Sequence, residues 1–189
     1  MSQLSRDEFL QKIQSNEPLD NLDLSEIDLS YEDLKGRKLA GVNLRNAHLQ
    51  NANLQDVDFR NSNLEGAFLF GANLRNACFD GAKLNGAKLQ DTNLEGASFK
   101  NADMPRISLF GTHLVNTNFE GANMTHAKLK RAILKKANLK GANLSDAHLD
   151  RSDLTDANLS EANLTRASLK NAITNGATFD NAIMEGTIT

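Results

Sequence analysis

The sequence repeats with a period of five residues over nearly its whole length. From Leu19 to Met184, every fifth position carries Leu, Phe or Met at 33 of 34 places, with Thr174 the exception. Two places before each of these large residues, the chain carries Ala at 21 of 34 positions. A period of five fits neither the roughly 3.6 residues of an α-helical turn nor the alternation of a β-strand. The chain must therefore turn a corner once in every repeat.

The corner of each repeat is marked by residues that tolerate a left-handed backbone. All twelve glycines lie two places after a position of this five-residue series, as at Gly36 and Gly141, and Asn and Asp are frequent at the same place. These residue types adopt a positive φ at the least cost. We therefore expect one left-handed residue per repeat. The large residue and the small residue two before it then point inwards, and the other three face solvent.

Four repeats make one coil, as the positions of the phenylalanines indicate. Among the large inward residues, Phe occurs only at Phe59, Phe79, Phe99, Phe119 and Phe179, all in one 20-residue register. A second column alternates in charge at the same spacing: Arg60, Asp80, Lys100, Glu120 and Lys140. Residues stacked on neighbouring parallel strands, about 4.8 Å apart, would pair in this way. We expect a square tower of about eight coils, roughly 40 Å tall at that spacing.

The chain divides into a capping helix at residues 1–18 and a repeat domain at residues 19–189. Ser5 and Glu8 form the capping-box pattern that begins a helix, and Pro18 is expected to end it. The apolar residues of this helix could cover the first coil; they are Leu4, Phe9, Leu10 and Ile13. Each coil contacts only its neighbours, so the ends of the stack need protection.

The other end carries the repeat almost to the last residue, with no helical sequence to cover it. Ile183, Met184 and Ile188 lie there. An open edge of this kind pairs readily with a second copy of the chain. We expect a homodimer through this end, and a short coil-like cap is the alternative.

The motif Ala-Asn-Leu-x-Gly, present at residues 137–141, resembles that of the pentapeptide-repeat proteins. The resemblance covers about nine-tenths of the chain. It implies an all-β fold, a right-handed quadrilateral parallel β-helix, and it implies little about function. One bacterial branch resembles duplex DNA and modulates DNA gyrase or topoisomerase, protecting it from quinolones or toxins. Its members carry a dimerising helix, bulging loops and a markedly acidic surface. This chain has neither of the first two and a net charge of only −3. Other members resemble secreted effectors or secretion-associated proteins.

Three phenylalanines depart from the repeat at outward positions. Phe68 and Phe70 flank the inward Leu69, and Phe110 lies two coils further along the same side. By strand spacing the three fall within roughly 10 Å along the tower. Exposed aromatic residues that cluster mark protein-binding sites. We interpret them as a patch that binds a protein partner or a second subunit; isolated surface residues are the alternative.

A basic run from Lys128 to Lys140 carries six cations and no acid. It could bind phosphate groups. The next coil places Asp150 in register with Lys130, and Asp156 with Lys136, so ion pairing across strands explains the run as well. We favour ion pairing and expect no direct binding of nucleic acid. Next to the three phenylalanines, the stretch Met104-Pro105-Arg106-Ile107 departs from the repeat, and Pro105 could mark a local bend.

The sequence predicts no enzyme, no cofactor and no metal site. Its four histidines are scattered over outward positions, and the single cysteine, Cys78, has no basic neighbour in register to activate it. No stretch approaches the roughly 18 apolar residues of a membrane span. We expect a cytoplasmic protein, with export by a non-classical route as the alternative. The function predicted is therefore a non-enzymatic scaffold that binds another protein.

Overall fold

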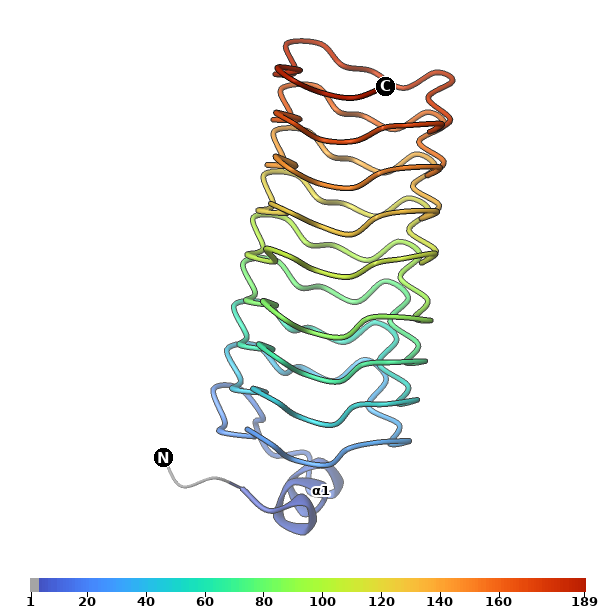
Figure 1. Cartoon of the computed structure of the whole chain (residues 1–189). Coiled ribbons are helices and arrows are strands. Elements are labelled where there is room, and N and C mark those ends of the chain that lie inside the picture. Colours follow the sequence, from blue (N-terminus) through green and yellow to red (C-terminus); the bar gives the residue numbers. More distant parts are fainter. Residues whose placement is uncertain (1–3) are drawn as a thin grey trace.

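The computed structural model describes residues 4–189 as one stack of coils that begins on a short helix (Figure 1). Within this range the only helix is α1, Arg6–Gln14, and no strand is longer than a single bridge residue. Parallel bridges join residues 20 apart throughout, from Asp23↔Asn43 to Ser168↔Ile188. Successive bridge residues lie five apart, so each coil has four sides. The four-repeat coil is confirmed, and the frequent corners explain why no side forms a longer strand.

The predicted left-handed residue is present at every corner. From Asn21 to Gly186, each residue two places after a large inward residue has a φ between 54° and 72°. Some corners need glycine for a second reason. At Gly66, a Cβ would lie 2.3 Å from Oδ1 of Asn46 in the coil below. A side chain at Gly66 would therefore require the Asn46 side chain to move.

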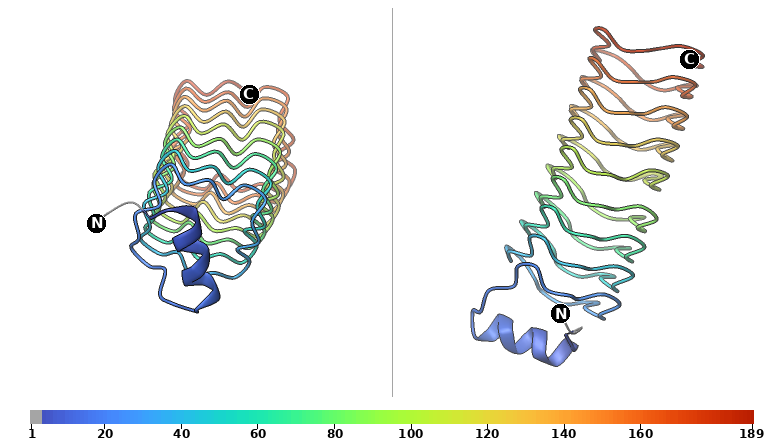
Figure 2. Two further views of the ribbon diagram at one scale, coloured as in Figure 1. Left: turned by 90° about the horizontal axis from the view of Figure 1, so that it is seen from below. Right: turned by 90° about the vertical axis from the view of Figure 1, so that its left-hand side faces the viewer.

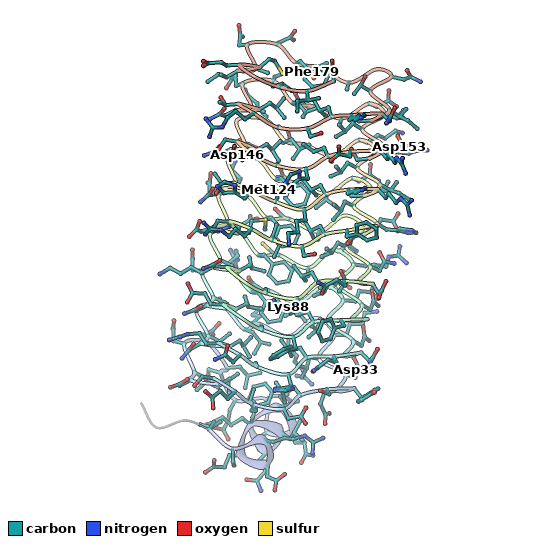
Figure 3. The ribbon with its side chains drawn as sticks, viewed as in Figure 1. Asp33, Lys88, Met124, Asp146, Asp153 and Phe179 are labelled. Carbon is teal, nitrogen blue, oxygen red and sulfur yellow. The ribbon has the colours of Figure 1, made fainter. Side chains whose placement is uncertain are left out.

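Inside the tower, the large and small inward residues pack as expected. Phe59, Phe79, Phe99 and Phe119 are fully buried and stack with ring centroids 5.1, 4.7 and 5.2 Å apart. Phe179 continues their register but is only partly buried, because it lies in the last coil, at the end opposite α1 (Figure 3). Burial of this continuous core drives folding of the repeat.

The bridge position explains why asparagine precedes leucine so often. Oδ1 of Asn138 accepts a hydrogen bond from the backbone amide of Lys140 at 3.2 Å. Its side-chain amide donates to Oδ1 of Asn118 in the coil below at 3.1 Å, and Asn158 donates to Asn138 in turn at 3.3 Å. One side chain therefore stabilises a corner and joins two coils.

Helix α1 lies across the first coil (Figure 2). The capping box is confirmed: the Ser5 amide donates to the Glu8 carboxylate at 2.8 Å, and the Glu8 amide donates to Ser5 Oγ at 3.3 Å. Phe9 is fully buried, and Leu4, Leu10 and Ile13 pack partly buried against the core. The prediction that Pro18 ends the helix is wrong. The helix ends at Gln14, and Asn16 then takes a left-handed φ of 52°.

Two inward positions near the start break the small-residue rule, and α1 explains one of them. Glu32 is half-buried and forms an ion pair with Arg6 of α1. Arg37 is also half-buried in the first coil. These positions have no coil beneath them, so a long polar side chain can extend towards the helix or the solvent.

Candidate protein-binding face

The structure places the three outward phenylalanines on one side of the tower; we call Phe68, Phe70 and Phe110 the aromatic patch. Phe68 is half-buried, with its ring centroid 4.8 Å from that of His48 and 6.0 Å from that of Phe70. Phe70 is 37% exposed and Phe110 is 49% exposed. Phe70 and Phe110 occupy one column with Gln90 between them, so they lie about 10 Å apart by strand spacing. Phe68 and Phe70 contact each other, whereas Phe110 extends the patch by two coils.

Two shallow hollows adjoin the patch along the neighbouring corner; together we call them the corner trough. The first is lined by Ser30, Tyr31, Gln50, Asn51, Phe70, Gly71 and Asp91. The second is lined by Asp91, Thr92, Asn93, Gly111, Thr112 and His113. Gly111 has open space where other corners carry a side chain, whereas beside Gly71 the Asn51 Oδ1 atom lies 2.4 Å from where a Cβ would be. Tyr31, which is 78% exposed, borders the trough. The sequence analysis missed Tyr31, although its 20-residue register with Gly71 and Gly111 would have indicated it.

The backbone ladder is weaker beside the trough, between residues 86–92 and residues 105–113; we call this the seam. The parallel bridges Lys88↔Ser108 and Asn93↔His113 persist across it, but five of the hydrogen bonds that join successive coils elsewhere between residues 21 and 188 do not reach good hydrogen-bond geometry here. Their donors are the amides of Gly86, Leu89, Asp91, Ser108 and His113. Bonds at the margins are long, including Asn93 to Ala72 and Leu94 to His113, both 3.3 Å. Oε1 of Gln90 and Oγ1 of Thr112 are also buried without a hydrogen-bond partner.

The inward residues at the seam are larger than the alanine that fills the same positions in most coils. Ile107 stands between Ala87 and Ala127 in its column, and Thr92 and Thr112 occupy neighbouring small-residue positions. All three are buried. Added methyl groups in a closely packed core shift the neighbouring backbone, and these three residues lie where the ladder bonds are weak.

Pro105 does not break the ladder through its missing amide. In other repeats the equivalent amide donates to an Asp or Asn two residues earlier, as Arg60 does to Asp58 at 3.1 Å. In the repeat of Pro105, Oδ1 of Asp103 instead accepts from the side-chain amide of Asn123 at 2.7 Å. The weak ladder bonds lie between the coil of Pro105 and the coil before it, and the local bend at Pro105 stays a prediction.

The ion pairs expected from register are largely replaced by others. Of the alternating column, only Lys100 and Glu120 pair, at 3.1 Å. Arg60 pairs with Asp58 at 2.6 Å, and Lys140 pairs with Glu161 at 3.3 Å. In the basic run, the predicted pairs Lys130–Asp150 and Lys136–Asp156 do not form among the described residues. Instead Lys135 pairs with Asp153 at 3.2 Å, and Asp150 accepts from Ser168 Oγ at 2.7 Å. The expectation that these two cross-strand pairs explain much of the run is wrong, because only Lys135 and Lys140 of the run form ion pairs.

The C-terminal coil is open at its upper side. Met184 points inwards yet is 38% exposed, because no further coil covers it. Ile183 and Ile188 are also more than half exposed, but they occupy outward bridge positions rather than the open end of the core. The amides of Thr174 and Phe179 donate no hydrogen bond within residues 4–189. The last coil therefore presents both apolar side chains and free backbone donors.

No group of metal-ligating side chains is present within residues 4–189. Burial raises the pKa of the Cys78 thiol, which disfavours the reactive thiolate. In the described part of the chain, no helix has the length and apolar character to cross a bilayer.

Comparison with known proteins identifies the repeat. The family model for pentapeptide repeats matches eight copies, at residues 38–76, 77–114, 106–141, 132–171 and 147–186. Among solved structures, HetL, a pentapeptide repeat protein involved in heterocyst differentiation regulation from the cyanobacterium Nostoc sp. strain PCC 7120, is 28% identical. That match covers 97% of this chain and 96% of HetL, with a TM-score of 0.47. The plasmid-mediated fluoroquinolone resistance protein QnrB1 is 18% identical over 86% of this chain and 82% of QnrB1, with a TM-score of 0.44. Among curated proteins, the sequence has no significant match.

Proposed function

The chain belongs to the pentapeptide-repeat family, whose fold is a right-handed β-helix, and from that premise we propose that it is a non-enzymatic scaffold that binds another protein. The binding surface we propose is the aromatic patch together with the corner trough. One observation carries the proposal: Phe70 and Phe110 expose 37% and 49% of their surface in one column, on a fold whose apolar residues are otherwise largely inside.

Three features support this face over the others. Large exposed aromatic residues contribute most of the affinity in protein interfaces, and they do so best beside a concave surface. The trough supplies that concavity at Gly71 and Gly111. Tyr31, which is 78% exposed, adds another aromatic ring at the border of the trough.

A second interface in the proposal joins two copies of the chain through the C-terminal coil. Met184 exposes an inward side chain, and Ile183 and Ile188 add apolar surface at the rim. The free amides of the last coil could pair with the same edge of a second copy. Substitution of Met184 by Asp is expected to abolish the dimer, measured as molar mass by light scattering coupled to size exclusion. A monomeric wild-type protein would refute this part of the proposal.

The alternative partner, DNA gyrase or topoisomerase, requires rows of acids that imitate DNA phosphates. Between residues 19 and 189, no outward column of this tower carries acids on two successive coils. The column from Arg60 to Lys140 alternates in charge instead. The surface therefore favours a partner that recognises apolar groups, and we do not extend the DNA-mimic function to this chain.

The test is affinity capture from native lysate with three baits: the wild type, the triple variant Phe68→Asp/Phe70→Asp/Phe110→Asp, and a control triple variant Gln55→Asp/Ile173→Asp/Asn175→Asp. Both variants add the same charge to outward positions, and the control leaves both proposed interfaces unchanged. We expect a partner that is retained by the wild type and by the control variant but lost from the phenylalanine variant. Identical protein lists from all three baits would refute the proposed face, and recovery of gyrase independent of the patch would favour the alternative.

A further inference from the structure

The cations of the upper coils divide into two groups. In residues 121–180, the cations with an ion-pair partner are Lys135, Lys140 and Arg166. The cations without one are Lys128, Lys130, Arg131, Lys136, Arg151 and Lys170. All of the second group except Lys136 lie on a single corner of the tower and are exposed; we call these five residues the basic corner. Unpaired cations gathered on one corner leave a local positive potential on a chain whose net charge is −3.

The basic corner continues the aromatic patch and the corner trough along the tower. Lys130 lies one coil above Phe110 in the same column, and Arg131 lies one coil above Gly111. Arg151 follows Arg131 after one more coil. At about 4.8 Å per coil, the cations begin about 5 Å beyond Phe110 and extend a further 5–10 Å. The three features therefore form one continuous surface, apolar at the lower coils and basic at the upper coils.

The acids on this surface leave the positive charge largely in place. Asp150 lies among the cations, but it accepts a hydrogen bond from Ser168 Oγ at 2.7 Å and pairs with no cation. Asp91 lies lower, in the corner trough, beside the aromatic patch. Lys88 occupies the bridge position one coil above Phe68 and is also exposed.

We propose that this surface binds an acidic segment of a protein partner, with apolar side chains of the segment against Phe70 and Phe110 and its carboxylates against Lys130, Arg131 and Arg151. The inference rests on the proposed function and adds the chemical class of the partner. An extended peptide rises about 3.3 Å per residue, so two apolar residues about three positions apart would match the phenylalanine column. Acidic residues would follow within two or three positions.

The order of the groups favours a protein segment over nucleic acid. Proteins that bind single-stranded nucleic acid place cations beside the aromatic rings, because each stacked base brings its own phosphate. Within the height of the aromatic patch, Lys88 is the one cation in a column with a ring, and the cations of the basic corner begin one coil beyond the patch. The charge nearest Phe70 in the trough is the acidic Asp91. The faces of the Phe68 ring are partly covered by His48 and Phe70. This arrangement fits a ligand whose apolar and charged parts are separated in the same way.

The experiment measures fluorescence anisotropy with the full chain and a labelled peptide in which two leucines three positions apart precede four glutamates. Comparison probes are the same peptide with lysines in place of glutamates and a labelled single-stranded oligonucleotide. The test variant is Lys130→Gln/Arg131→Gln/Arg151→Gln. Its matched control, Lys135→Gln/Lys140→Gln/Arg166→Gln, removes the same charge from cations that are already paired.

We expect the acidic peptide to bind the wild type, more weakly at high salt, and to lose at least about tenfold in affinity in the test variant. The control variant should lose less than about threefold. The inference would be overturned if the acidic peptide does not bind, or if the lysine peptide binds equally well. It would also be overturned if both variants lose the same affinity, or if the oligonucleotide binds more tightly than the acidic peptide. If capture of a partner depends on the aromatic patch but not on the basic corner, the proposed function stands and only this inference fails.

Discussion

The stack of buried phenylalanines allows a sharp prediction about stability. Phe99 is fully buried, with its ring 4.7 Å from Phe79 and 5.2 Å from Phe119. Substitution by Ala removes both stacking contacts and leaves a cavity that rigid neighbouring coils cannot fill. Such truncations cost about 3–5 kcal/mol, of which each aromatic pair accounts for roughly 0.5–1.5 kcal/mol. The matched change Phe110→Ala removes a ring that is 49% exposed and should cost less than about 1 kcal/mol.

The assay is urea unfolding followed by far-ultraviolet circular dichroism, because the chain has no Trp to report by fluorescence. With a slope of about 2–3 kcal/mol per M, Phe99→Ala should lower the midpoint by about 1–2 M. Each coil contacts only its neighbours, so amide exchange should accelerate most in the coils between Phe79 and Phe119. Equal midpoints for the two variants would refute the assignment of Phe99 to a continuous core.

Two further predictions concern the corners and the carboxylates. Gly66→Ala and Gly141→Ala both place a side chain at positive φ, which costs about 1 kcal/mol each. Only Gly66 faces Asn46 Oδ1, which would lie 2.3 Å from the added Cβ. Thermal melts should therefore show the larger loss of stability for Gly66→Ala, and equal losses would contradict the stacked-corner geometry. The backbone amide of Ser30 donates to the Asp28 carboxylate at 2.9 Å and lowers its pKa, so this contribution to stability is fully present above the unfolded pKa of about 3.9 and is lost as the pH falls through the folded value. Asp28→Asn should therefore reduce the acid dependence of unfolding below about pH 4, and an unchanged dependence would exclude this carboxylate as a cause.

Sequence alone predicted the features that the repeat itself controls. The register of Phe59 and Phe99 identified the 20-residue coil, because inward positions must match from coil to coil for the core to pack. The left-handed corners could be predicted because the glycines, which tolerate a positive φ, recur at one position of the repeat. The sequence pattern placed the end of α1 at Pro18. The helix ends earlier, at Gln14, because Asn16 adopts a left-handed conformation just after it.

Surface pairing could not be predicted from register, because long side chains reach several partners. Arg60 pairs with Asp58, two residues away on its own coil, and Lys140 pairs with Glu161 rather than Glu120. The differences in free energy between such exposed pairs are small, so column position alone does not choose among them. The seam was missed because Ile107 satisfies the rule for a small or β-branched inward residue, and the rule ignores its added volume.

The central claim is that the face around Phe70 and Phe110 holds a protein partner. Hydrogen–deuterium exchange of the full chain, alone and with the partner recovered by affinity capture, tests it most directly. The account predicts slower exchange at residues 68–72, 88–93 and 108–113, and no change on the side that carries residues 58–60, 78–80 and 98–100. Protection confined to that second side or to the C-terminal coil would contradict the claim.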